Sequence, residues 1–257
     1  MLDREKARIM VHKTLNGNQL KVIAMAAMTI DHLVCVVFPG YPKDWWILAL
    51  HAIGRMAAPM FWFFVAEGYH YTRDWRKYAF RLFLFAIVGH FAYNFAFGIP
   101  FIPFQTTVFN QTSVIWTLLG GLLALVIADS EGLKQWQKMV LILLICVITF
   151  CADWSCIGAM VILYIGENRG NFKKQMTMML FWVAVYAAVY AIFIDPVYGA
   201  LQMFVALTIP LLKRYNGQRG SWKGMKWFFY LYYPLHLVVC GLIRIALHGN
   251  IGVMIGG

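Results

Sequence analysis

The stretch LKVIAMAAMTIDHLVCVVF, residues 20–38, decides the fold class. An apolar run of this length is long enough to cross a bilayer as a helix. Ionisable side chains inside such a span are costly and rare, so Asp31 and His32 are candidates for a functional site. His32 follows Lys21 by roughly 16 Å of helix, at about 1.5 Å per residue. This spacing puts Lys21 at the membrane edge and His32 near the middle of a hydrocarbon core about 30 Å thick.

Apolar residues dominate the rest of the chain as well. Of its 257 residues, 61% are hydrophobic and 13% are charged, against about 25% charged in an average soluble domain. We therefore predict an all-α, polytopic transmembrane helix bundle with a single transmembrane domain at residues 20–248. Residues 1–19 lack the apolar core of a secretory signal and are expected to be a short basic cytoplasmic lead, with an interfacial helix as the alternative. The glycine-rich residues 249–257 are expected to be a flexible tail.

About nine membrane-spanning helices are expected from the apolar runs. They are Leu20–Phe38, Trp46–Glu67, Tyr78–Phe97, Ser113–Ala128, Met139–Ala152, Trp154–Gly166, Met176–Ile194, Val197–Leu212 and Trp227–Leu247. The fifth, sixth and eighth are short for a crossing of about 20 residues. One or two of these are therefore open to a tilted, re-entrant or buried placement.

Positive charge alternates between the loops as expected when short cytoplasmic loops collect Lys and Arg. With the N-terminus inside and the C-terminus outside, every Lys and Arg except Lys43, Arg55 and Arg244 falls on the cytoplasmic side. The basic residues of these inner segments are Arg4, Lys6, Arg8, Lys13, Lys21, Arg73, Arg76, Lys77, Arg81, Lys134, Lys138, Arg169, Lys173, Lys174, Lys213, Arg214, Arg219, Lys223 and Lys226. Topology and attraction to anionic lipid thus account for the net charge of +11, and no nucleic-acid partner is expected.

The five cysteines carry little functional signal, and no spacing resembles a zinc site, so no metal is expected. Three of them fall in apolar runs, where a free thiol behaves as a small hydrophobe. Cys151 and Cys156 flank a predicted outer turn, so they are either free or joined by a disulfide.

Three ionisable side chains from different helices reach a similar depth: His32, Arg55 and His236. Each has a structural alternative. Arg55 and Asp31 can form a buried ion pair, and His236 can be satisfied by a neighbouring carbonyl. Tyr233, three residues before His236, is assigned either to the acceptor side of the site or to a structural role.

A second group lies near the cytoplasmic face, where Lys21 begins the first span and Glu67 and His70 share one face of the second helix. Arg73 and Asp74 follow directly. This cluster is either a ligand site or a solvated salt-bridge network.

Five segments together resemble the TraX family in order and spacing over almost the whole chain. They are residues 20–39 (LKVIAMAAMTIDHLVCVVFP), 54–82 (GRMAAPMFWFFVAEGYHYTRDWRKYAFRL), 152–165 (ADWSCIGAMVILYI), 213–220 (KRYNGQRG) and 226–243 (KWFFYLYYPLHLVVCGLI). TraX-like proteins are polytopic membrane acetyltransferases, named for the enzyme that acetylates the N-terminus of conjugative pilin. A basic residue followed after ten positions by histidine also resembles the signature of a wider superfamily of transmembrane acyltransferases that modify cell-surface sugars.

This resemblance implies an enzyme of the bacterial cytoplasmic membrane that takes its acyl group from cytosolic acetyl-coenzyme A. The signature residues correspond to Lys21 and His32, with the histidine catalytic. The acceptor is an extracytoplasmic amine or hydroxyl, on a protein N-terminus or a glycan. Its identity stays open, because fold and family do not transfer a substrate.

The chemistry of these side chains suggests a role for each. His32 suits a general base for the attacking acceptor, and Arg55 or a helix-end amide suits stabilisation of the thioester oxygen. Asp31 is expected to meet Arg55 or another helix. Cations near the cytoplasmic face suit the phosphates of the donor. The expected donor-binding residues are Lys21, Glu67, His70, Arg73, Arg76 and Lys77.

Two other classes of protein would also carry ionisable groups at this depth. A secondary transporter commonly shows two related halves with broken helices, and no internal symmetry is visible here. A non-enzymatic membrane assembly protein would not need the buried groups for activity.

Overall fold

The computed structural model describes residues 14–105 and 108–253, and within these ranges it is all-helical, with no strand. The long apolar helices are α2 (Gly17–Val37), α5 (Trp75–Phe97), α9 (Phe172–Phe193) and α12 (Met225–His248). Two further long segments are composite. One joins α3 (Trp45–Gly54) to α4 (Ala57–Tyr71), and the other joins α10 (Pro196–Leu201), the 3₁₀ helix η1 (Gln202–Thr208) and α11 (Ile209–Lys213).

Three shorter apolar helices complete the bundle: α6 (Val114–Ala128), α7 (Gln135–Thr149) and α8 (Ser155–Glu167). Within the described residues, the six long segments are long and apolar enough to cross a membrane. The chain is a multi-pass membrane protein, and the predicted fold class is confirmed. The predicted span Val197–Leu212 belongs to an 18-residue segment, Pro196–Lys213, which is long enough to cross. The predicted spans Ser113–Ala128 and Met139–Ala152 correspond to α6 and α7, which have only 15 residues each.

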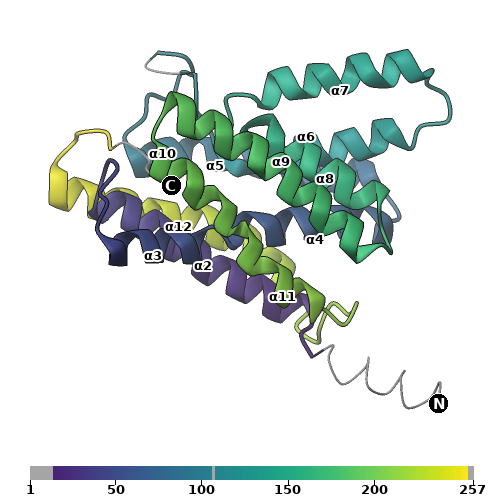
Figure 1. Ribbon diagram of the computed structural model, residues 1–257, viewed down its shortest axis with the longest axis horizontal. Helices are drawn as coiled ribbons and strands as arrows, with labels where there is room; N and C mark the ends of the chain where they lie inside the picture. The colour runs from purple at the N-terminus through teal and green to yellow at the C-terminus, as the bar shows by residue number, and fades with distance from the viewer. Residues whose placement is uncertain (1–13, 106–107, 254–257) are drawn as a thin grey trace.

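The bundle is built around α8, which contacts α4, α6, α7 and α9, while α12 packs against α2 and α5. Figure 1 shows α7 along one edge, and its apolar residues such as Leu143 and Val147 are largely exposed. Exposed apolar side chains on a membrane protein face lipid, so this edge needs no protein partner.

Local sequence sets several helix starts. Asn16 and Gln19 form a reciprocal capping box at the start of α2, with N···O distances of 3.0 and 2.9 Å. Asp74 caps α5 by accepting from the backbone N–H of Lys77. Asp195 caps α10, whose first residue is Pro196. The helices therefore begin close to where the polar residues interrupt the apolar runs.

All five cysteines are free, so of the two alternatives for Cys151 and Cys156 the free state holds. The described part of the tail, expected to be flexible, is docked: the backbone N–H of Val253 donates to the carbonyl of Phe97. The buried Arg244 explains this docking, because its guanidinium donates hydrogen bonds to a backbone carbonyl of the tail and to two carbonyls at the end of α5. Residues 1–13 of the expected lead lie outside the described residues, and α2 begins at Gly17.

Candidate active site

The centre of the site is a buried ion pair between two helices. The Asp31 carboxylate of α2 binds the Arg55 guanidinium, which follows the end of α3. The second carboxylate oxygen accepts from Nδ1 of His51 at 2.9 Å. Both partners come from the same segment, because His51 precedes Arg55 by one helical turn. The alternative that Arg55 pairs with Asp31 is thus confirmed.

Close packing lets the carboxylate reach its partners. Gly54 lies directly against Asp31, and a Cβ at Gly54 would overlap the Asp31 side chain. The helix is also interrupted here, since α3 ends at Gly54 and α4 begins at Ala57. The break places Arg55 at the junction of the two half-helices.

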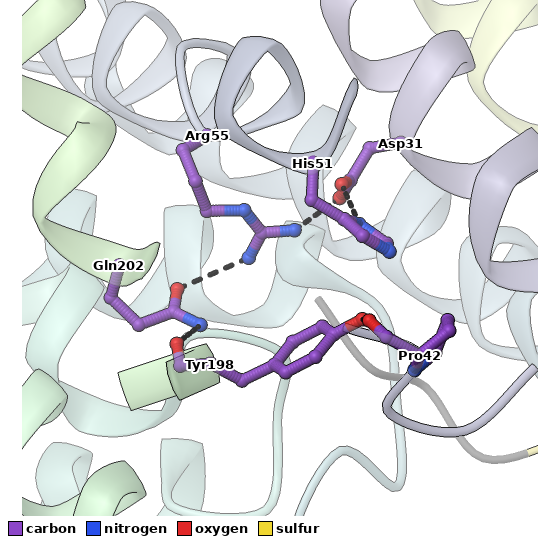
Figure 2. Close-up of polar contacts among 6 residues, drawn as sticks. All are labelled: Asp31, Pro42, His51, Arg55, Tyr198 and Gln202. Atoms are coloured by element: carbon purple, nitrogen blue, oxygen red, sulfur yellow. Dashed lines mark hydrogen bonds and ion pairs between the residues drawn. The ribbon is translucent and has the colours of Figure 1, made fainter. Parts of the chain in front are cut away.

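A second tier of hydrogen bonds holds Arg55 from the opposite side (Figure 2). Its Nη1 donates to Oε1 of Gln202 at 3.1 Å, and Gln202 in turn donates to the carbonyl of Tyr198 at 3.1 Å. The Tyr198 hydroxyl donates to the carbonyl of Pro42 at 2.9 Å. The guanidinium is therefore fixed between α2 and the composite segment that begins with α10.

His32, on the neighbouring face of α2, pairs with His236 of α12. Nδ1 of His32 and Nε2 of His236 are 2.9 Å apart, and the two rings are nearly parallel, with an angle of 6°. Nδ1 of His236 lies 3.0 Å from the carbonyl of Tyr232, one turn earlier on α12. The alternative that a neighbouring carbonyl satisfies His236 is therefore confirmed for one ring nitrogen, while the other nitrogen meets His32.

The ion pair and His32 meet at one small enclosed gap. Its volume is about 20 Å³, and its lining includes Asp31, His32, Arg55, Phe97 and Asp153. A cavity of this size holds about one water molecule. The gap lies roughly where the sequence places the membrane midplane, so Asp31, His32 and Arg55 border an enclosed polar point at that depth.

A much larger pocket opens at the other end of α2. It has a volume of about 490 Å³ and contains Lys21, whose ammonium lies 5.2 Å from the centre of the Phe64 ring. The other charged residues in its lining are Glu67, Arg81 and Arg219. Aromatic rings make up much of the rest: Phe61, Phe64, Tyr71, Tyr78, Tyr215, Phe229 and Tyr230. The pocket thus combines three cations with stacking surfaces.

The two cavities share no lining residue. Along α2 between Lys21 and His32, Met25 and Met28 are buried in the core.

The family model described as "TraX protein" matches residues 16–244. The chain belongs to the TraX family. It is also similar to a protein of Dichelobacter nodosus named "Probable fimbrial assembly protein FimC, serogroup H1". The two are 27% identical over 228 residues, which cover 86% of this chain and 92% of the relative. No solved structure matches.

The structure of this TraX protein separates the expected donor-binding residues. Lys21 and Glu67 line the large pocket, whereas His70, Arg73, Arg76 and Lys77 do not. Nε2 of His70 lies 3.3 Å from the carbonyl of Gly166. The guanidinium of Arg76 lies over the Trp75 ring, and the ammonium of Lys77 pairs with Asp74 at 3.3 Å. Arg73 lies in the turn between α4 and α5.

Several of these groups belong to the surface salt-bridge network that was the alternative. Glu67 accepts from Nε of Arg169 at 3.0 Å, and Arg169 also lies over the Tyr71 ring. Hydrogen bonding to Glu67 raises the pKa of the Arg169 guanidinium, so this cation stays charged. Arg81 and Arg219 supply the pocket instead. Arg81 follows Lys77 by one turn of α5, which places it deeper toward the bundle.

Tyr233 lines neither cavity. It is buried, with 1% of its surface exposed, and its ring packs edge-on against His236 at a centroid distance of 5.5 Å. This position favours the structural assignment for Tyr233 over a place at the acceptor.

Three parts of the site were missed from the sequence. His51 has no predicted role above, although its spacing of four residues from Arg55 on an apolar helix is a usable signal. Gln202 and Asp153 reach the site only through tertiary packing, so no local pattern marks them.

One group of described residues has the composition of a metal site. Asp31, Cys35 and His51 offer ligand atoms within 4.8 Å of one another. Arg55 already neutralises this carboxylate, so a divalent cation would be bound beside a positive charge. We assign no metal there.

Proposed function

We propose that this TraX-family protein is an acyltransferase that moves an acetyl group from acetyl-coenzyme A to an amine or hydroxyl. The observation that carries the proposal is His32, whose ring borders an enclosed gap beside the Asp31–Arg55 pair. Its Nε2 has no hydrogen-bonding partner among the described residues. A buried imidazole that borders a gap and keeps one nitrogen without a partner is suited to general-base catalysis.

The large pocket suits the donor. Phosphates are recognised by Arg and Lys side chains, and three of these line the pocket: Lys21, Arg81 and Arg219. Its aromatic rings offer stacking surfaces for an adenine. Because α2 extends from this pocket to the gap, a donor held at Lys21 would direct its thioester arm along the helix toward His32.

In the transfer step, the acceptor N–H or O–H loses its proton to His32 as its heteroatom bonds to the thioester carbonyl carbon. The carbon–sulfur bond then breaks, and the proton passes to the leaving thiolate. Arg55 retains a buried Nε–H without a partner among the described residues. This donor suits the negative charge that develops on the carbonyl oxygen.

We place the protein in the bacterial cytoplasmic membrane, with the pocket of Lys21 facing the cytosol. The acceptor then reaches the gap from outside, as a protein N-terminus or a glycan.

The name of the Dichelobacter relative favours one other candidate function, a non-enzymatic role in fimbrial assembly. A secondary transporter is the third class. Neither alternative consumes the thioester, which distinguishes both from an acyltransferase.

The test is release of free thiol and transfer of label when purified protein in nanodiscs is given acetyl-coenzyme A with a radiolabelled acetyl group. We expect turnover that falls by about 10²–10⁴-fold in His32→Gln. His70→Gln is the matched control, because His70 borders neither cavity. No turnover in the parent protein with either water or peptide amines as acceptor, or full turnover in His32→Gln, would contradict the proposal.

A further inference from the structure

The hydrogen bonds of the histidine pair determine which nitrogens carry protons. The Tyr232 carbonyl can only accept, so Nδ1 of His236, 3.0 Å away, must carry a hydrogen. A neutral imidazole has one N–H. Nε2 of His236 is therefore an acceptor, and Nδ1 of His32, at 2.9 Å, is the donor to it. The lone pair of His32 is left on Nε2.

We propose that His236 is a positioning residue that keeps His32 in its Nδ1–H tautomer and so presents Nε2 as the base. This inference rests on the proposed acyl transfer. The order of bonds runs in one direction, from the Tyr232 carbonyl through His236 to His32. Because a backbone carbonyl can only accept a hydrogen bond, it fixes the direction of every bond in this series.

The geometry holds the pair rigidly. Both histidines are buried, with 9% and 7% of their surfaces exposed, and the Tyr232 ring stacks on His236 at 5.3 Å. The Tyr232 hydroxyl also lies 2.6 Å from Oγ1 of Thr29, which itself donates to the Met25 carbonyl. Tyr232 therefore fastens α12 to the same face of α2 that carries His32.

The same bond serves both stages of the reaction. When Nε2 of His32 takes the acceptor proton, its Nδ1–H still donates to His236, so the ring does not have to turn. When that proton passes to the leaving thiolate, His32 returns to the starting tautomer. Asp31 cannot replace His236, since adjacent residues on a helix point about 100° apart and its carboxylate is occupied by Arg55 and His51.

Two substitutions separate positioning from packing. In His236→Gln, the amide oxygen can accept from Nδ1 of His32, whereas His236→Leu fills the space without an acceptor. We expect Leu to lower kcat by at least about tenfold, within the range of a misplaced base, with little change in KM, and Gln to restore most of it. His248→Leu, on the same helix but bonded to the Val36 carbonyl, is the control. Normal kcat in His236→Leu, or equal loss in the Leu and Gln variants with both still folded, would overturn the inference.

A spectroscopic measurement keeps the inference testable if neither variant folds. In ¹⁵N-histidine-labelled parent protein, assigned by loss of the signal in His32→Gln, Nδ1 of His32 should give a protonated shift and Nε2 an unprotonated one. The reverse pattern would overturn the inference. This readout does not depend on turnover, so a protein with no acyltransferase activity would refute the proposed function while leaving the tautomer assignment to be judged separately.

Discussion

Replacing Asp31 by Asn should destabilise the protein far more than the loss of an ordinary ion pair. The Asp31 and Arg55 side chains are only 12% and 4% exposed, so the substitution leaves a cation buried without its counter-charge. Breaking such a pair costs about 3–5 kcal/mol. His51 also exchanges a charged acceptor for a neutral one, which adds to the loss. We therefore expect a decrease of at least about 3 kcal/mol in the free energy of unfolding.

The measurement is equilibrium unfolding in mixed micelles with increasing SDS, followed by tryptophan fluorescence. A double-mutant cycle with Arg55→Gln isolates the pair, and the double variant should recover about 2–3 kcal/mol relative to the sum of the single changes. Glu67→Gln is the matched control, since its partner Arg169 is 39% exposed; it should cost no more than about 1 kcal/mol. A loss below about 1 kcal/mol in Asp31→Asn, or additive single changes, would refute this account of the site.

Three other predictions test the packing, the pocket and a helix cap. Gly54→Ala should cost about 1–3 kcal/mol because its Cβ would displace Asp31, whereas Gly132→Ala, with open space around it, should change the same unfolding free energy little. Arg81→Gln should raise the KM for acetyl-coenzyme A by roughly tenfold through loss of a charged phosphate contact, while Arg76→Gln, outside the pocket, should not; equal KM values would remove Arg81 from the donor site. Asp195→Ala should cost about 0.5–2 kcal/mol as a lost cap. Burial opposes the ionised form of Asp195, but hydrogen bonds from the Tyr198 and Val197 N–H groups and the Lys43 ion pair outweigh it and lower its pKa. The parent's advantage over Asp195→Ala should therefore be complete above the unfolded pKa of about 3.9 and disappear as the pH falls through the lower folded value; an advantage that persists at lower pH would show that the carboxylate is not its source.

The apolar runs predicted the helices well because each is bounded by polar residues or turn-forming residues. The expected span at 20–38 is α2 at Gly17–Val37, and the expected span at 113–128 is α6 at Val114–Ala128. The second span was predicted as one helix, yet it breaks between Gly54 and Ala57. The interruption coincides with a tertiary contact between Gly54 and Asp31, and hydrophobic periodicity does not encode such a contact.

The candidate site was predictable in part for the same reason. His32, Arg55 and His236 could be placed at one depth by counting residues, because helical rise is constant. Counting gives no rotation of one helix relative to another, so it could not show that His32 meets His236 while Asp31 meets Arg55. The basic cluster at the start of α5 shows the same limit. Charge placed Arg76 and Arg81 on one side of the membrane, but only packing decides which of them enters the pocket.

The electrostatics of the site explain how so many ionisable groups can lie at one depth in a bilayer. The charges of Asp31 and Arg55 cancel at contact, and Nδ1 of His51 adds a hydrogen bond to the carboxylate. The histidine pair forms its hydrogen bonds with both rings neutral: Nδ1–H of His32 donates to His236, and Nδ1–H of His236 donates to the Tyr232 carbonyl. The ion pair therefore carries no net charge, and both carboxylate oxygens and both terminal guanidinium nitrogens are hydrogen-bonded, which limits the cost of burying the pair. A proton taken up by His32 would place a new charge beside this pair, and the cost of burying that charge would favour passing the proton on to the departing thiolate.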